Sequence, residues 1–144
     1  MDVFLCNLRP RSVRARTPGR YKNGIRDAFR LFCPDSTYGP GPLYASVYYF
    51  HRRPSDQDAD NISKPILDAL EGLAYEDDRI VRFRQAAMFA LDADPLSELN
   101  LSGVPEVILA PLLEMLDQED HVLYVELGRL SFQQFRFGYE TMEV

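Results

Sequence analysis

The chain has 144 residues, of which 46% are hydrophobic and 12% aromatic. This length and composition are those of a globular protein that forms one domain around a single core. No apolar run approaches the ~20 residues that span a bilayer, and the N-terminus lacks a signal-peptide pattern. We therefore expect a cytoplasmic protein with no membrane contact, in which Cys6 and Cys33, among apolar neighbours, are buried free thiols.

Charge is distributed unevenly along the chain. The net charge of −6 argues against a nucleic-acid partner, because phosphate binding depends on lysine and arginine. However, residues 1–55 carry ten basic side chains against three acidic ones, whereas residues 92–144 carry eleven acidic side chains against two basic ones. This asymmetry indicates a basic binding face and a separate acidic face. A solvated surface rich in arginine explains the same counts equally well.

The first third of the chain predicts two strands with a loop and a helix between them. Residues 3–8 alternate loosely and predict a short strand, and the arginine-rich residues 9–24 predict an exposed loop that folds over a ligand. Apolar spacings of three and four predict a short helix over 25–32, which Pro34 ends. Residues 43–51, dense in β-branched and aromatic side chains, predict a central strand.

The middle of the chain changes period from two to about 3.6 near Asp60, which predicts a short amphipathic helix. We expect the helix to begin at Asp60 or Asn61, because Pro65 is tolerated in a first turn, and to end near Gly72. Its predicted buried stripe consists of Ile62, Ile66, Leu70 and Leu73. A third strand over 79–91 should follow directly after the acidic pair Asp77-Asp78.

The C-terminal third has the least regular pattern. Residues 92–121 contain turn signals and a predicted helix over 104–116, which Pro111 kinks or divides. The remaining predictions are strands at 122–127 and 130–137 and a frayed end at 138–144.

Carboxylates gather around one lysine in the middle of the chain. Asp58 and Asp60 point to the same side if the backbone is extended, and Asp60 and Lys64 are neighbours if it is helical. Asp78 follows Asp60 by eighteen residues, enough chain to fold back and complete a three-carboxylate cluster. Such a cluster favours a hard cation such as Mg²⁺, and carboxylate-bound cations beside a phosphate are typical of phosphodiester hydrolysis.

A purely structural explanation exists for each of these residues. Asp60 or Asn61 could cap the helix, and Lys64 with Asp68 could form only a helix ion pair. The Asp77-Asp78 pair could be a plain turn. The isolated histidines, His51 and His121, have the pattern of packed or solvated side chains rather than of ligands.

The pattern Asp58-x-Asp60-Asn61-x-x-Lys64-x-x-x-Asp68-Ala69-Leu70, followed by Asp77-Asp78, resembles the RusA family of Holliday junction resolvases. The resemblance covers most of residues 1–91 in element order and is sharp over 58–81. It implies a small single-domain α+β fold over 1–144, with a mixed β-sheet and helices packed on it. It also implies a Mg²⁺-dependent endonuclease, with Mn²⁺ as a possible substitute, that acts as a homodimer on branched, four-way DNA in recombination and repair.

By motif position, the resemblance makes Asp58, Asp60 and Asp78 the metal ligands, with Lys64 assisting them. Residues 92–121 look like an insertion that either joins a dimer contact or covers the core. The arginines and the lysine before the motif are expected to bind DNA phosphates: Arg9, Arg11, Arg14, Arg16, Arg20, Lys22, Arg52 and Arg53. Two alternatives stay open, a metal-dependent nuclease or phosphohydrolase with another substrate and a non-catalytic DNA- or protein-binding relative.

Overall fold

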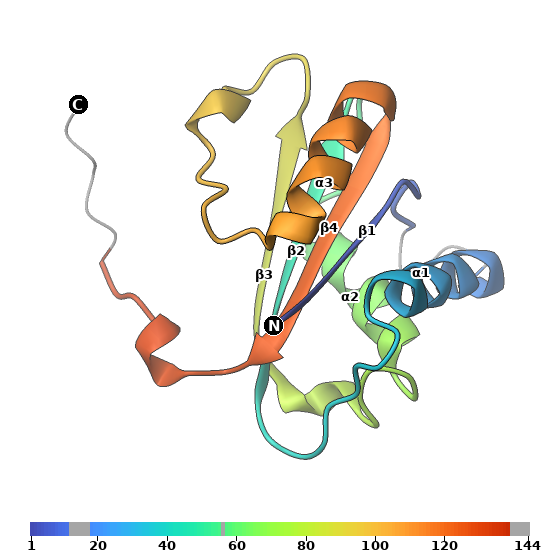
Figure 1. Cartoon of the computed structure of the whole chain (residues 1–144), viewed down its shortest axis with the longest axis vertical. Helices are drawn as coiled ribbons and strands as arrows, with labels where there is room; N and C mark the ends of the chain where they lie inside the picture. The colour runs from blue at the N-terminus through green and yellow to red at the C-terminus, as the bar shows by residue number, and fades with distance from the viewer. Residues whose placement is uncertain (12–17, 56, 139–144) are drawn as a thin grey trace.

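A four-stranded mixed sheet lies between two layers of helices (Figure 1). The computed structural model describes residues 1–11, 18–55 and 57–138. The elements in chain order are β1 (Asp2–Cys6), α1 (Pro18–Phe32), β2 (Leu43–His51), α2 (Ala59–Leu70), the 3₁₀ helix η1 (Asp78–Ile80), β3 (Val81–Ala90), η2 (Leu96–Glu98), α3 (Glu106–Gln118), β4 (His121–Arg129) and η3 (Phe132–Gln134). The predicted α+β domain with a mixed sheet is confirmed.

The strands lie in the order β1-β4-β2-β3, and β2 pairs parallel with β3 and antiparallel with β4. Two parallel neighbours require a crossover connection, which α2 provides. Helix α2 therefore runs back along the sheet, from the carboxyl end of β2 to the amino end of β3. This direction decides which acidic residues can meet.

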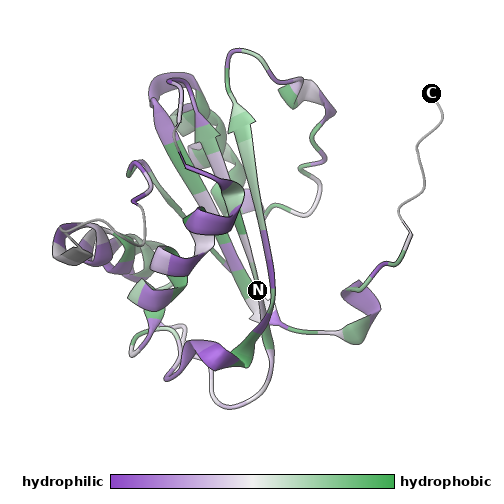
Figure 2. Ribbon diagram, turned by 180° about the vertical axis from the view of Figure 1, so that it is seen from behind, coloured by the Kyte–Doolittle hydropathy of each residue, from purple (hydrophilic) through white to green (hydrophobic). Residues whose placement is uncertain are grey.

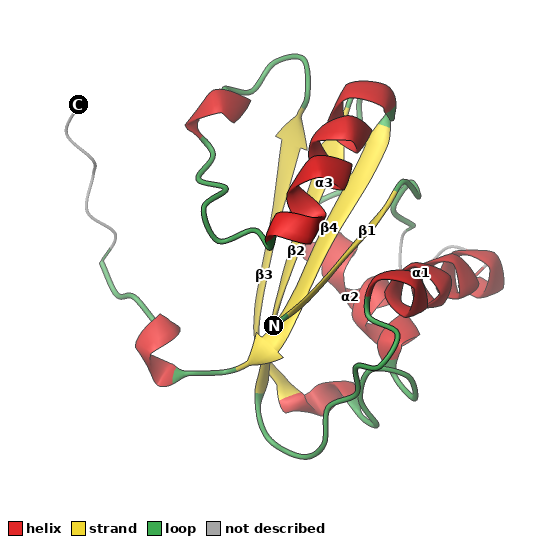
Figure 3. Cartoon of the chain, in the orientation of Figure 1, coloured by secondary structure: helices red, strands yellow, loops and turns green. Residues whose placement is uncertain are grey.

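Each face of the sheet has its own apolar core. Helices α1 and α2 pack on one face, where Ile25, Phe29, Ile62 and Ile66 are buried against Val47 and neighbouring strand residues. Helix α3 covers the other face through Ile108 and Leu112 (Figure 3). Apolar residues line the strands, and polar residues follow the outer faces of the helices (Figure 2). Of the described helices, none has both the length and the apolar character needed to cross a membrane.

Helix α1 begins earlier than predicted. The expectation of a loop over 9–24 is wrong for residues 18–24, which form the first turns of α1, while residues 12–17 lie outside the described parts of the chain. Tyr21 is buried one turn before Ile25 and extends the same apolar stripe. Gly19 and Gly24 lower the helical propensity of this segment. For this reason the sequence pattern does not predict the first turns of the helix.

Helix α2 begins at Ala59, so Pro65 lies inside the helix rather than in its first turn. The predicted start at Asp60 or Asn61 is thus one or two residues late. Proline has no N–H to donate to the carbonyl of Asn61, an exposed residue. The buried stripe of Ile62, Ile66 and Leu70 is confirmed.

The C-terminal third differs from the prediction at one element. Helix α3 continues through Pro111 without dividing, and β4 extends the predicted strand at both ends. The strand expected over 130–137 is wrong, because Ser131 accepts from the Gln133 amide and caps the 3₁₀ helix η3. The frayed end predicted over 138–144 falls almost wholly outside the described residues. Cys6 and Cys33 are buried and free, as expected.

Candidate active site

The start of α2 presents two carboxylates to solvent. Asp58 is the N-cap residue with extended backbone dihedrals, but its side chain makes no capping hydrogen bond. Asp60 follows in the first turn, and both residues are exposed. The expectation that Asp60 or Asn61 caps the helix is therefore wrong. Because neither carboxylate is used as a cap, both are accessible to a cation or to water.

Lys64 lies one turn further along the same face. Its Nζ is 3.2 Å from Oδ1 of Asp68, so the alternative of a helix ion pair is confirmed for these two residues. Both side chains are about half exposed, and such a pair stabilises a helix by only about 0.2–0.5 kcal/mol. The ammonium can therefore leave Asp68 for a stronger anion at little cost.

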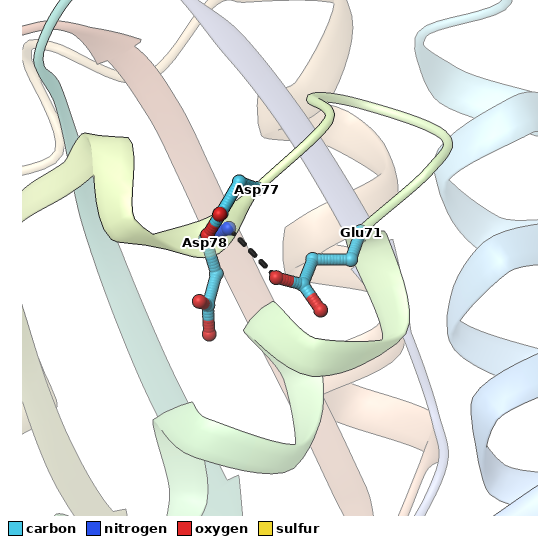
Figure 4. Close-up of side chains that lie close together, drawn as sticks. All are labelled: Glu71, Asp77 and Asp78. Carbon is cyan, nitrogen blue, oxygen red and sulfur yellow. Dashed lines mark hydrogen bonds between the residues drawn. The ribbon is translucent and has the colours of Figure 1, made fainter.

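Three carboxylates meet at the far end of α2 (Figure 4). Oxygen atoms of Glu71, Asp77 and Asp78 all lie within 4.8 Å of one another, and all three residues are partly buried. Glu71 follows the last residue of α2, and the other two enter β3 through η1. We call these residues the acidic cluster. Its oxygen donors are those that Mg²⁺ and Mn²⁺ prefer.

Asp77 and Asp78 have different partners within the acidic cluster. Arg79 binds Asp77 through its amide at 2.9 Å and through its guanidinium at 2.8 and 2.6 Å. These hydrogen bonds hold the pKa of Asp77 below its ordinary value. Asp78 has only a loose contact, 3.7 Å from Arg84, although its side chain is just 17% exposed. Asp78 is therefore the enclosed carboxylate whose oxygen atoms are least occupied by protein partners and most available to bind a cation.

Two further side chains hold this region in place. The Arg26 guanidinium of α1 donates to the carbonyls of Ala69 and Glu71 at 3.0 Å each. These hydrogen bonds supply donors for backbone carbonyls that have no partner within the helix at the end of α2. The Tyr75 hydroxyl donates to the Leu67 carbonyl at 2.6 Å. Burial, followed by the nearby charge of Asp78, raises the pKa of Tyr75, so this phenol stays protonated beneath the acidic cluster.

Within one chain, Asp58 and Asp60 do not join Asp78. Glu71 follows Asp60 by eleven residue steps, nearly all of them within helix α2, which places the two Cα atoms about 16 Å apart at 1.5 Å per step. Two ligands of one Mg²⁺ lie at most about 4 Å apart. The structure therefore groups Asp78 with Glu71 and Asp77, whereas most of the residues between Asp60 and Asp78 form helix α2.

Glu71 was not among the sequence candidates. A signal for it does exist, because Asp60, Lys64, Asp68 and Glu71 recur at spacings of four, four and three and so lie on one face of α2. Such a stripe is ordinary on a solvated helix. Only the fold shows that its last member meets Asp78.

Alanine at Glu71 should weaken the binding of Mg²⁺ at the acidic cluster by about 10- to 100-fold, the usual effect of removing a residue that orients a metal ligand. Glu71 Oε1 accepts from the Asp78 amide at 2.8 Å and fixes the turn that aims the Asp78 carboxylate. Isothermal titration with Mg²⁺ measures the affinity. Glu76→Ala, an exposed residue in the same turn, is the control. Equal losses in both variants would show that overall negative charge, rather than this hydrogen bond, matters.

The family model described as Endodeoxyribonuclease RusA matches residues 19–95, more than half of the chain. The chain belongs to the RusA family. The matched segment contains Asp58, Asp60, Lys64 and the acidic cluster, and it ends just inside the predicted insertion at 92–121. RusA proteins are endodeoxyribonucleases, and the family acts on branched DNA. A comparison with curated proteins finds no match.

The basic residues expected to bind DNA in this RusA-family chain fall into two groups. Arg9, Arg11 and Arg20 surround a cavity of about 100 Å³ beside Tyr21. Lys22 is exposed on the same helix, and Arg14 and Arg16 lie outside the described residues. The described members, Arg9, Arg11, Arg20 and Lys22, form the basic surface beside α1.

Arg52 and Arg53 instead bind the segment after β3. Arg52 donates to the Leu116 carbonyl at 2.7 Å and to Asp92 at 3.1 Å, and Arg53 pairs with Asp120 at 3.1 Å. These contacts join the end of β2 to both ends of the predicted insertion. Their first role is therefore structural.

Alanine at Arg52 should lower the free energy of unfolding by about 1–2 kcal/mol, because one charge-assisted hydrogen bond to a carbonyl and two partly exposed ion pairs, with Asp92 and Asp120, are lost. Urea denaturation measures the change. Arg53→Ala is the matched control and should cost less than about 0.5 kcal/mol, since its side chain is 75% exposed and pairs only at the surface. Equal stability of the two variants would contradict the structural role of Arg52.

Proposed function

We propose that this protein is a Mg²⁺-dependent endonuclease that resolves Holliday junctions by phosphodiester hydrolysis, in DNA recombination and repair. One observation carries the proposal: the segment that matches the RusA family contains a partly buried group of three carboxylates. Its substrate is branched DNA, and its compartment is the cytoplasm, where the free thiols of Cys6 and Cys33 stay reduced.

Asp58, Asp60 and Asp78 are the proposed metal ligands, with Mn²⁺ as an alternative ion. Bound Mg²⁺ supplies positive charge that offsets the charge developing on the phosphate. The N-terminus of α2 adds its helix dipole near Asp58 and Asp60, which favours a phosphate there. Lys64, one turn away, exchanges its weak partner Asp68 for a phosphate oxygen.

Helix α2 advances about 16 Å between the Cα atoms of Asp60 and Glu71, and Asp78 lies beside Glu71, which favours a second chain as the source of the third ligand. We therefore propose that the protein is a homodimer in which Asp58 and Asp60 of one protomer share an ion with Asp78 of the partner subunit. A two-fold axis would form two such sites, because each protomer contributes both ends of α2. Two sites suit paired cuts in a symmetric junction.

The basic surface beside α1 binds phosphates of the DNA that lie away from the scissile bond. Arg9, Arg11, Arg20 and Lys22 supply it, and Arg14 and Arg16, which lie outside the described residues, are proposed as further phosphate-binding side chains. Contacts of this kind position DNA without reading its sequence, and they release counterions. Binding should therefore weaken steeply as salt rises, even though the whole chain is acidic.

Cleavage of a labelled four-way junction beside a linear duplex tests the function, with Mg²⁺ and with EDTA, for the wild type and Asp60→Asn. We expect cutting that is selective for the junction and is lost both in EDTA and in the variant. Cleavage of linear and branched DNA alike would favour a nuclease with another substrate. Salt-sensitive binding without any turnover would favour a non-catalytic relative.

A further inference from the structure

Three phenylalanines form a cluster where the chain returns past β3. The rings of Phe83 and Phe135 meet edge to face with centroids 4.9 Å apart, and Phe132 stacks on Phe135 at 5.8 Å. Phe132 is 72% exposed, and Phe137, shortly after η3, is 92% exposed. We call Phe83, Phe132 and Phe135 the phenylalanine cluster. Large aromatic side chains exposed together mark a surface that binds something.

A β-bulge turns Phe83 toward this surface. In the β2–β3 pairing Val81 faces Leu43 and Phe83 faces Tyr44, so Arg82 is the extra residue. Regular alternation would put Phe83 on the same face as Val81, which is buried in the core with α2. The bulge moves Phe83 to the opposite face, where Phe135 meets it, and puts Arg84 on the side of Asp78.

Two arginines are direct sequence neighbours of the phenylalanine cluster, Arg82 beside Phe83 and Arg136 beside Phe135. Arg82 and Arg136 are exposed, and neither forms an ion pair with any residue that the structure describes. Residues 130–138 contain no acidic side chain. Exposed aromatic rings interleaved with arginines bind single-stranded nucleic acid, because rings stack on bases and guanidinium groups contact phosphates. An apolar protein partner would gain nothing from these free arginines.

The phenylalanine cluster lies near the acidic cluster. Phe83 follows Asp78 by five residues, so their Cα atoms are less than about 18 Å apart, the fully extended length of that segment. Among the described strands, β3 is at the edge of the sheet, and η3 lies outside that edge (Figure 1). The acidic cluster and the phenylalanine cluster therefore both lie at the amino end of this edge strand.

We propose that the phenylalanine cluster and Phe137 stack on unpaired bases beside the branch point of the DNA, while Arg82 and Arg136 contact the adjoining phosphates. The inference rests on the proposed function, since it concerns the same substrate. It adds a surface that recognises the branch, because bases at a branch point leave the stack more easily than bases inside a linear duplex. The recognition surface lies largely beyond residue 95, where the family match ends.

Tryptophan introduced at Phe132 tests the stacking directly, because the chain contains no tryptophan of its own. Binding of a four-way junction should quench the emission of Phe132→Trp, and a linear duplex should not. Leu31→Trp, at a site on α1 that is 76% exposed, is the control and should keep its emission. The double variant Phe132→Ala/Phe137→Ala should bind the junction about 5- to 100-fold more weakly and bind the duplex unchanged.

The outcomes separate this inference from the proposed function. Unchanged emission of Phe132→Trp, in a protein that still binds and cuts the junction, would overturn the inference alone. A change of sedimentation coefficient in the double variant would also overturn it, by showing that the rings join two protein chains. Absence of junction binding by the wild type would overturn both proposals at once.

Discussion

Asparagine in place of Asp78 should reduce Mg²⁺-dependent junction cleavage by at least about 1000-fold, which corresponds to about 4 kcal/mol of transition-state stabilisation. The substitution keeps the shape of the side chain and removes the charge that would hold the ion. The fold should survive, because Asp78 contributes only a 3.7 Å contact with Arg84, and Glu71 and Asp77 lose a repelling neighbour. Single-turnover cleavage and thermal unfolding measure the two effects.

Asp77→Asn is the matched control, with the same change of charge one residue away. Arg79 already occupies Asp77 through three close contacts, so we expect a much smaller loss of cleavage. Mg²⁺ should raise the Tm of the wild type and of Asp77→Asn, and it should leave Asp78→Asn unaffected. Full activity of Asp78→Asn would remove this residue from the site.

Equal amounts of Asp60→Asn and Asp78→Asn chains, each inactive alone, should regain activity when they are unfolded and refolded together. If each site combines Asp60 of one protomer with Asp78 of the other, half of the dimers are mixed and each holds one intact site. About one quarter of the wild-type sites should then return. The rate of junction nicking after refolding measures this fraction.

A second mixture provides the control. Asp58 and Asp60 lie together at the start of α2, so Asp58→Asn and Asp60→Asn should damage the same half of each site. A mixed dimer of these two variants has no intact site, and refolding them together should restore nothing. Recovery in neither mixture, with dimers present, would place the whole metal site within one chain, at the acidic cluster.

Several elements could be predicted because local pattern alone decides them. The strand over 43–51 matches β2 at both ends, since a run of β-branched and aromatic residues bounded by Pro42 and Arg52 has no competing interpretation. Residues 130–137 have a similar aromatic density and yet form no strand. A strand also needs a neighbour to pair with, and local pattern carries no information on which edges of the sheet are available.

For the candidate site as well, residue spacing predicted some features and could not predict those that depend on how the elements are arranged in space. Spacing was enough to identify the exposed carboxylates at the start of α2 and the Lys64–Asp68 pair. It did not give the direction of α2, which follows from the parallel pairing of β2 with β3. For that reason Asp78 was predicted beside Asp60, whereas it meets Glu71 at the other end of the helix.

The sheet order also has a consequence for how the protein folds during synthesis. Strand β4 lies between β1 and β2, although it is the last strand to leave the ribosome. Until it is made, β1 has no partner in the sheet, and long-range pairing of this kind folds slowly. The segment over 19–95 that carries the family signature lacks both β1 and β4, so it cannot build this sheet by itself. A nascent chain therefore completes this sheet only after β4 has been synthesised.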